Sequence, residues 1–87
     1  MKQMINYLNG VYNIQANSNI SIYDPALLNG YGVFDFVRTY NRKPFLLEEH
    51  IERLFQSAHL SEINNPFTSD DIKSVVLRLI ELNVVGE

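Results

Sequence analysis

The sequence predicts an α+β domain in which short strands come first and two amphipathic helices follow. Apolar residues alternate with period two in the first half of the chain, where Asn9-Gly10 also marks a tight turn. Helical periodicity of apolar residues occupies the second half. Strands followed by helices, rather than alternating with them, are typical of α+β proteins. We therefore expect N-terminal β-hairpins and antiparallel strands followed by two helices.

The length and composition describe one small domain. The 87 residues are 46% hydrophobic and 20% charged, with a net charge of −3 and no cysteine. A chain this short buries only about 60–65% of its unfolded surface, so we expect marginal stability. The absence of a basic cluster argues against nucleic-acid binding, and no apolar run reaches the ~18 residues that span a bilayer. Without cysteine, and with His50 and His59 outside any ligand cluster, we expect no metal site.

The N-terminal third predicts a hairpin and a further strand. Asn9-Gly10 between apolar residues favours a type I′ turn, because both central residues of that turn need positive φ. Strands are expected near Met4–Leu8 and Val11–Ile14. Alternation around Ile20 and Ile22 predicts a third strand over Asn19–Tyr23.

The middle of the chain predicts a corner followed by the strongest strand. Asp24-Pro25 starts a turn or a single helical turn, and Asn29–Gly32 forms a flexible corner. Val33–Tyr40 is predicted to be a strand that turns at Asn41–Lys43 and returns over Pro44–Leu47. Its alternation separates two faces, one of Phe34, Phe36, Arg38 and Tyr40, the other of Val33, Asp35, Val37 and Thr39.

Two helices complete the prediction. Apolar residues at helical spacing predict a helix from about Glu48 to His59, and its apolar stripe is Leu47, Ile51, Leu54, Phe55 and Ala58. Thr68 or Ser69 caps the second helix, and Thr68 with Asp71 resembles a capping box. Asn83 or Gly86 can end that helix. Its apolar stripe is Ile72, Val75, Val76, Leu79 and Leu82.

Arg53 is the first candidate functional residue. At ~100° per residue it lies about 200° from Ile51, opposite to the apolar stripe. Spacing alone favours a solvated pair with Glu49 one turn earlier, worth a few tenths of a kcal/mol. The alternative is a phosphate ligand, because a guanidinium fork matches phosphate oxygens.

The second candidate is the face that carries Phe34, Phe36 and Arg38. Aromatic strand faces are usually packed in a core, so composition favours packing on the helices, with Arg38 extending to the edge. The alternative is a pocket wall. Asp35 falls on the opposite face, and the sequence assigns it no role.

Residues 30–58 resemble the N-terminal signature of the class IV aminotransferases, the fold-type IV pyridoxal phosphate enzymes. That family includes branched-chain aminotransferases, D-amino-acid transaminases and aminodeoxychorismate lyase. Residues 49–58 match the pattern Glu-His-x-x-Arg-Leu-x-x-Ser-Ala at every specified position. The resemblance implies that Arg53 binds the 5′-phosphate of pyridoxal 5′-phosphate. It also implies that Phe34, Phe36 and Arg38 shape the substrate pocket.

The resemblance covers roughly residues 5–83, and the chain departs from the family pattern in places. Asp35 stands where the family usually has glutamate, and Asn29 stands where many branched-chain enzymes have tyrosine. None of Lys2, Lys43 and Lys73 has the context of the family's Schiff-base lysine. The resemblance therefore implies that residues 1–87 form the N-terminal small domain, that the catalytic large domain is absent, and that the chain alone is inactive.

Three hypotheses for function follow. The leading one is a domain or fragment of an aminotransferase that moves an amino group between an amino acid and a 2-oxo acid. The family resemblance further implies a homodimer, and the absence of a signal-peptide core leads us to expect a cytoplasmic location. The alternatives are an aminodeoxychorismate-lyase-type enzyme fragment and a non-catalytic stand-alone interaction domain. The two enzyme hypotheses predict exposed apolar surface where a large domain docks.

Overall fold

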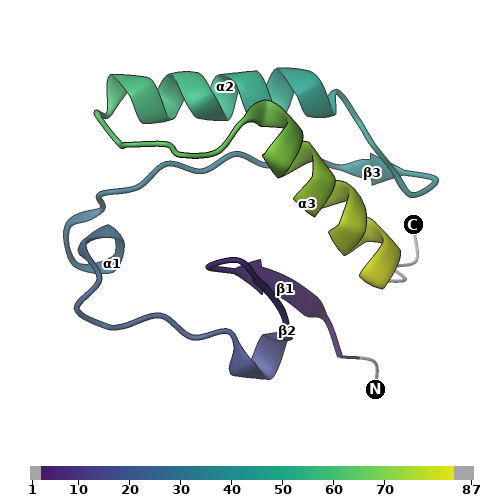
Figure 1. The fold of residues 1–87 in the computed structure, drawn as a ribbon, viewed down its shortest axis with the longest axis horizontal. Helices are drawn as coiled ribbons and strands as arrows, with labels where there is room; N and C mark the ends of the chain where they lie inside the picture. Colours follow the sequence, from purple (N-terminus) through teal and green to yellow (C-terminus); the bar gives the residue numbers. More distant parts are fainter. Residues whose placement is uncertain (1–2, 84–87) are drawn as a thin grey trace.

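The computed structural model describes residues 3–83, which adopt the α+β arrangement predicted from the sequence. Along the chain, two separate two-stranded antiparallel sheets precede two long helices, and a short helix comes between the sheets in sequence. In space, that short helix stands apart from both sheets (Figure 1). The long helices, α2 (Leu47–Leu60) and α3 (Ser69–Leu82), pack against each other, and the N-terminal hairpin lies against α3. Within the described residues, no helix is long and apolar enough to cross a membrane.

The N-terminal hairpin is confirmed. Strand β1 (Ile5–Leu8) pairs with β2 (Val11–Ile14) in the register that places Leu8 opposite Val11. Asn9 and Gly10 take φ values of 51° and 86°, as a type I′ turn requires. Tyr7 and Tyr12 face each other across the strands and pack edge to face with ring centres 5.0 Å apart.

The predicted strand over Asn19–Tyr23 is wrong. A 3₁₀ turn, η1 (Gln15–Asn17), follows β2, and the chain then runs without strand pairing to Asp24. Ile20 and Ile22 are exposed to solvent. Apolar alternation describes a surface that could pair, but a strand also needs a neighbour to complete its backbone hydrogen bonds. None of the described residues provides one here.

The helical turn after Asp24 is confirmed as α1 (Pro25–Asn29). The Asp24 side chain accepts a hydrogen bond from the Ala26 amide at 2.9 Å, and Pro25 stands at the first helical position. Gly30 ends the helix in the left-handed conformation with φ of 65°. This conformation suits glycine and turns the chain toward residues 31–38.

The predicted strand over Val33–Tyr40 is wrong for residues 33–38 and correct only for its end. Strand β3 (Thr39–Tyr40) pairs with β4 (Lys43–Pro44) through a turn in which Asn41 and Arg42 have positive φ. Residues 33–38 pair with no strand among the described residues, although their exposure still alternates along the segment. The predicted return strand over Pro44–Leu47 ends early, because Leu46 is left-handed with φ of 55° and α2 begins at Leu47.

Helix α3 begins and ends where the sequence predicts. Thr68 accepts a hydrogen bond from the Asp71 amide while the Asp71 carboxylate accepts one from the Thr68 amide, which completes the capping box. Asn83 is the C-cap. Gly86, the other predicted end, lies outside the described residues.

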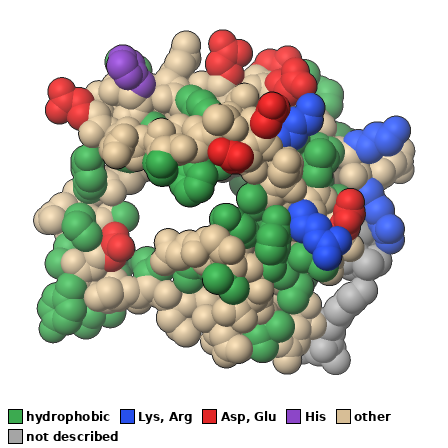
Figure 2. All heavy atoms as spheres, in the orientation of Figure 1, with side chains coloured by type: hydrophobic (Ala, Val, Ile, Leu, Met, Phe, Trp, Pro, Cys, Tyr) green, Lys and Arg blue, Asp and Glu red, His purple; other side chains and the backbone are tan. Residues whose placement is uncertain are grey.

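The packing is open. Only Leu47, Ile51 and Ala58 are buried among the described residues, and all three lie on α2. The accessible surface is 7144 Å², whereas a globular protein of this mass exposes about 5,300 Å². The radius of gyration is 14.0 Å, against roughly 12 Å for a compact chain of this length. Figure 2 shows hydrophobic side chains on the surface around an opening in the middle of the molecule.

Asn83 joins the two ends of the described chain. Its Oδ1 accepts from the Ile5 amide at 2.7 Å, and its Nδ2 donates to the carbonyls of Ile5 at 2.9 Å and Leu79 at 2.8 Å. The side chain thus imitates a neighbouring strand for β1 and closes the end of α3. These hydrogen bonds attach the hairpin directly to the end of α3, beside the packing of β1 on that helix.

We expect Asn83→Ala to detach the hairpin from α3. It removes three hydrogen bonds, each worth about 0.5–1.5 kcal/mol net, so we expect a loss of about 1.5–4.5 kcal/mol in the free energy of unfolding. Hydrogen exchange of the Ile5 amide measures the local effect. Asn19→Ala is the matched control, because exposed Asn19 makes no side-chain hydrogen bond in the described part of the chain. Equal exchange rates in both variants would contradict the prediction.

Candidate functional site

Arg53 lies in the middle of α2 and pairs with Asp35. Its Nε donates to Asp35 Oδ2 and its Nη2 to Asp35 Oδ1, both at 2.8 Å, which is a two-point fork. The Arg53 side chain remains 63% exposed, while that of Asp35 is 11% exposed. The solvated Glu49–Arg53 pair favoured by spacing is not found among the described residues; Arg53 has a different carboxylate partner, reached from another part of the chain.

His50 joins this pair from one helical turn earlier. Its Nδ1 lies 2.7 Å from Asp35 Oδ1 and 2.9 Å from Arg53 Nη2. One ring nitrogen cannot donate to the carboxylate and accept from the guanidinium at once. We assign the tautomer in which Nδ1 carries the proton and donates to Asp35. Arg53 Nη2 then makes its hydrogen bond to Asp35 Oδ1, and its 2.9 Å approach to Nδ1 is a contact between two donors rather than a hydrogen bond. We call Asp35, His50 and Arg53 the Asp35 cluster.

The alternation of residues 33–38 places Asp35 in this cluster. Val33, Asp35 and Val37 are partly buried, whereas their neighbours point to solvent. The i,i+3 spacing of His50 and Arg53 brings both side chains to one side of α2, where Asp35 meets them. The Phe36 amide donates to Asp35 Oδ1 at 2.7 Å and holds the carboxylate against its own backbone.

The electrostatics of the cluster follow from these contacts. The hydrogen bond from Arg53, and then that from His50, hold the pKa of the Asp35 carboxyl well below its usual range, because both favour the charged form. The same hydrogen bond raises the pKa of the Arg53 guanidinium above its ordinary value. Asp35 is therefore ionised and Arg53 is cationic throughout the physiological pH range.

The other predicted site residues lie on the opposite side of the segment. Phe34 is 88% exposed and Phe36 71% exposed, and Arg38 is exposed beside them. Core packing, which composition favoured for this face, is therefore wrong for the described chain. The structure does not join these residues to Arg53; it separates them by the width of the segment, with Asp35 on the helix-facing side. Their assignment to a substrate pocket stays a prediction.

Sequence reasoning missed Asp35 and His50 as partners of Arg53. The usable signal was present in the alternation that turns Asp35 away from the aromatic face, and in the i,i+3 spacing of two basic side chains on α2. What the sequence lacks is the position of α2 relative to residues 33–38, which decides whether those side chains meet.

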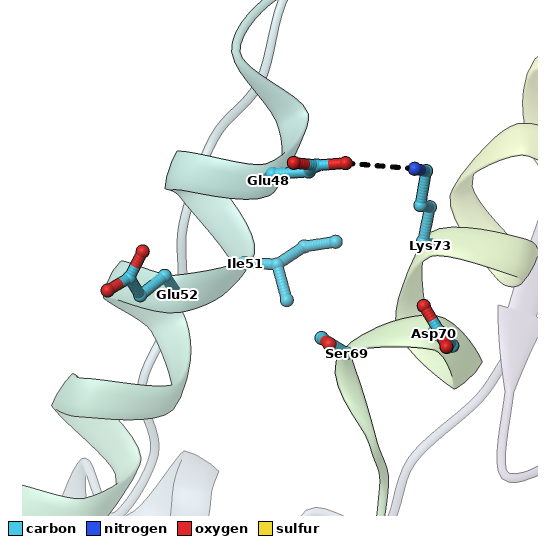
Figure 3. Close-up of a pocket in the computed structure, with 6 residues that line it drawn as sticks. All are labelled: Glu48, Ile51, Glu52, Ser69, Asp70 and Lys73. Atoms are coloured by element: carbon cyan, nitrogen blue, oxygen red, sulfur yellow. Dashed lines mark hydrogen bonds and ion pairs between the residues drawn. The ribbon is translucent and has the colours of Figure 1, made fainter.

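A separate polar pocket of about 230 Å³ lies between α2 and α3 (Figure 3). Lys73 Nζ donates to Glu48 Oε1 at 3.0 Å between the two helices, and Ile51 projects from α2 into the same space. The remaining lining residues are Glu52, Ser69 and Asp70. Carboxylates outnumber the single cation here, so this pocket does not suit a phosphate, and the Asp35 cluster remains the candidate anion site. No group of three or more potential ligand side chains is placed to hold a metal ion within residues 3–83.

Comparison with known proteins decides the family. Residues 32–87 match the family described as Amino-transferase class IV, a span that covers more than half of the chain and contains the whole Asp35 cluster. The chain belongs to the class IV aminotransferases.

Relatives within the class IV aminotransferases differ in their reactions. A putative branched-chain-amino-acid aminotransferase of Methanocaldococcus jannaschii is 39% identical over 77 residues, 88% of this chain. An aminodeoxychorismate lyase of Bacillus subtilis is 35% identical over 81 residues, 93% of the chain. A D-alanine aminotransferase of Staphylococcus haemolyticus is 29% identical over 77 residues, 88% of the chain. The chain spans only 27–28% of the length of these class IV relatives.

The Asp35 pair makes stability depend on pH in one direction. The folded-state pKa of Asp35 is depressed, so its contribution is complete above the unfolded value of about 4 and is lost as pH falls below that value. We expect Asp35→Asn to destabilise the protein at pH 7, and we expect the difference from wild type to shrink between about pH 5 and pH 2. Urea unfolding at each pH measures it. The control is Glu52→Gln, which removes an exposed carboxylate of α2. A pH-independent difference for Asp35→Asn would contradict the prediction.

Proposed function

We propose that this chain is the small domain of a pyridoxal-phosphate-dependent enzyme that moves an amino group between an amino acid and a 2-oxo acid. Arg53 is its phosphate ligand. One observation carries the proposal: within the family-matched motif of residues 49–58, Arg53 is held in a defined orientation while most of its side chain remains open to solvent.

The donor set at Arg53 fits one side of a phosphate site. Asp35 takes the edge formed by Nε and Nη2, while Nη1 has no partner among residues 3–83. A guanidinium retains its charge at all relevant pH values and can donate to an anion through the remaining edge. When bound, pyridoxal phosphate supplies an electron sink for the carbon at which the amino group is exchanged.

The lysine that this chemistry needs is not provided near Arg53. Lys73 is engaged with Glu48, and Lys43 lies in β4 of the second hairpin. Lys2 lies outside the described residues. Neither described lysine contacts the Asp35 cluster. In the proposed enzyme another part of the protein supplies this lysine, and residues 1–87 alone do not turn over an amino acid.

The open surface supports a larger assembly. The chain exposes roughly 1,800 Å² more than a compact protein of its mass, which is more than twice the ~800 Å² that one partner contributes to a standard protein interface. Phe34 and Phe36 belong to this excess surface. In the proposed enzyme a larger domain covers it, and two copies of the enzyme form a homodimer. Phe34, Phe36 and Arg38 then become one wall of the substrate pocket.

A lyase of the aminodeoxychorismate type is the second candidate. The Bacillus subtilis lyase is 35% identical to this chain, between the values for the two aminotransferases named above. The Asp35 cluster serves either reaction, because phosphate binding does not depend on what happens to the substrate.

The first experiment is the intact mass of the protein from its native source. A mass well above 10.1 kDa supports an enzyme that contains this chain as one domain. A mass of 10.1 kDa, together with no binding of pyridoxal phosphate, would overturn the proposal. Amino-group transfer assays against 2-oxo acids then separate the aminotransferase from the lyase.

We expect Arg53→Gln to weaken pyridoxal phosphate binding by the protein at its natural length. Loss of a charge-assisted hydrogen bond corresponds to about 1.5–3 kcal/mol, or roughly 10- to 150-fold in affinity. Equilibrium dialysis of the cofactor-free protein measures it. Arg78→Gln is the control, because exposed Arg78 on α3 pairs only with Glu81 in the described chain. Equal affinities in the two variants would rule out Arg53 as the ligand.

We expect Phe36→Ala to change substrate choice while leaving the fold intact. The ring is 71% exposed in the described chain, so its loss leaves no cavity among these residues. Relative kcat/KM values for small and large amino acids, in the protein at its natural length, measure the effect. Ile22→Ala removes a similarly exposed apolar side chain outside the proposed pocket and is the control. An unchanged substrate order would remove Phe36 from the pocket.

A further inference from the structure

We infer that Asp35 is a positioning residue for phosphate binding: it fixes the Arg53 guanidinium by one edge so that the other edge is presented to an anion. This inference rests on the proposed function and names a residue that acts through Arg53 without contacting the phosphate itself. Asp35 is the carboxylate of the cluster, and it lies outside the helical motif of residues 49–58.

The geometry makes Asp35 a clamp on one edge of Arg53. Both oxygens of the carboxylate are used, Oδ2 by Nε and Oδ1 by Nη2, so the plane of the guanidinium is fixed as well as its position. A single hydrogen bond would leave the group free to rotate about the bond axis. Nη1 is the terminal nitrogen that this clamp leaves without a partner among residues 3–83.

The exposure of Arg53 explains why a clamp matters. With its side chain 63% exposed, little packing restrains the long flexible stem. An arginine in this setting loses rotamer freedom when it binds an anion, and that loss opposes binding. Because Asp35 already restricts the rotamers of Arg53 in the unbound protein, less rotamer freedom is lost when the anion binds.

Asp35 is itself held firmly enough to act on Arg53. Its side chain is 11% exposed, and besides Arg53 it accepts from the Phe36 amide at 2.7 Å and lies 2.7 Å from His50 Nδ1. Four donor atoms, on three residues from two parts of the chain, therefore restrain one short side chain. The bond to the adjacent Phe36 amide depends on that shortness, because a longer side chain carries its carboxylate away from the backbone.

A negative charge near a phosphate ligand has an opposing effect, which makes the inference testable. Asp35 weakens the attraction of Arg53 for an anion through simple electrostatics. If charge dominated, removing Asp35 would tighten phosphate binding. If orientation dominates, removing it weakens binding. The protonated Nδ1 of His50 and the Phe36 amide both donate to Asp35 Oδ1 and reduce the charge that it presents outward, which favours orientation.

The experiment uses the cofactor-free protein at its natural length, titrated with pyridoxal phosphate and separately with pyridoxal, which lacks the phosphate. We expect Asp35→Ala and Asp35→Asn to weaken pyridoxal phosphate binding about three- to tenfold, which corresponds to the free-energy cost of immobilising one side chain on binding. Asp35→Glu restores part of the loss, since it keeps both oxygens but loses the Phe36 amide. Binding of pyridoxal stays within twofold of wild type in all three variants, roughly the limit of such a comparison.

Glu49→Gln is the matched control. It removes one carboxylate one helical turn before Arg53, at the partner position that spacing alone favours, but Glu49 makes no ion pair with Arg53. We expect it to bind pyridoxal phosphate as wild type does, or slightly more tightly. A second readout is the ¹⁵N NMR signal of Arg53 Nε–H, which we expect to be protected from exchange in wild type and Asp35→Glu and lost in Asp35→Ala.

The outcomes separate this inference from the proposed function. If wild type binds pyridoxal phosphate and Asp35→Ala binds it equally or more tightly, the positioning role is overturned while the proposed function stands. An equal loss for pyridoxal and pyridoxal phosphate overturns it as well, because the effect is then structural. If wild type binds neither pyridoxal phosphate nor inorganic phosphate, the proposed function fails and this inference fails with it.

Discussion

The apolar face of α2 is the constraint on which the other elements depend. Every buried side chain of the described structure lies on it, and both α3 and the extended segment of residues 33–38 are placed with respect to this helix. The same helix turns His50 and Arg53 away from that face at i,i+3 spacing. The packing face and the candidate anion site therefore lie on two sides of one 14-residue helix. A change that rotates α2 to improve packing would also move Arg53 away from Asp35.

The segment of residues 33–38 takes part both in packing on the helices and in the Asp35 cluster, because the exposure of its side chains alternates along the chain. Successive side chains point toward and away from the helices, so Asp35 meets Arg53 while Phe34 and Phe36 face outward. No strand among the described residues fixes this arrangement. The fork between Asp35 and Arg53 is thus one of the few directional contacts that hold the segment in register. It therefore has a structural role as well as the proposed functional one.

What the sequence predicts correctly is what neighbouring residues decide among themselves. Asn9-Gly10 specifies its turn, Asp24-Pro25 its helical turn, and Thr68 with Asp71 its cap, because each involves groups only a few residues apart. The predictions that depend on a partner far away in the sequence were wrong more often. Residues 19–23 and 33–38 have strand-like patterns but no strand beside them in the described chain. The partner of Arg53 is a further example. Spacing along the helix favours Glu49, but Arg53 pairs with Asp35, because Asp35 accepts two hydrogen bonds from the guanidinium and is shielded from water, which strengthens the pair.

The hydrogen bonds of Asn83 to Ile5 join residues 78 positions apart, and this spacing has a consequence for the order of folding. A ribosome releases the N-terminal hairpin first, and its turn allows it to close locally. Its anchor, Asn83, is translated 78 residues after Ile5, and closing a loop of that length costs conformational entropy. During synthesis the hairpin can therefore dock only after α3 has emerged, and until then it is an isolated two-stranded hairpin, which is at best marginally stable in water.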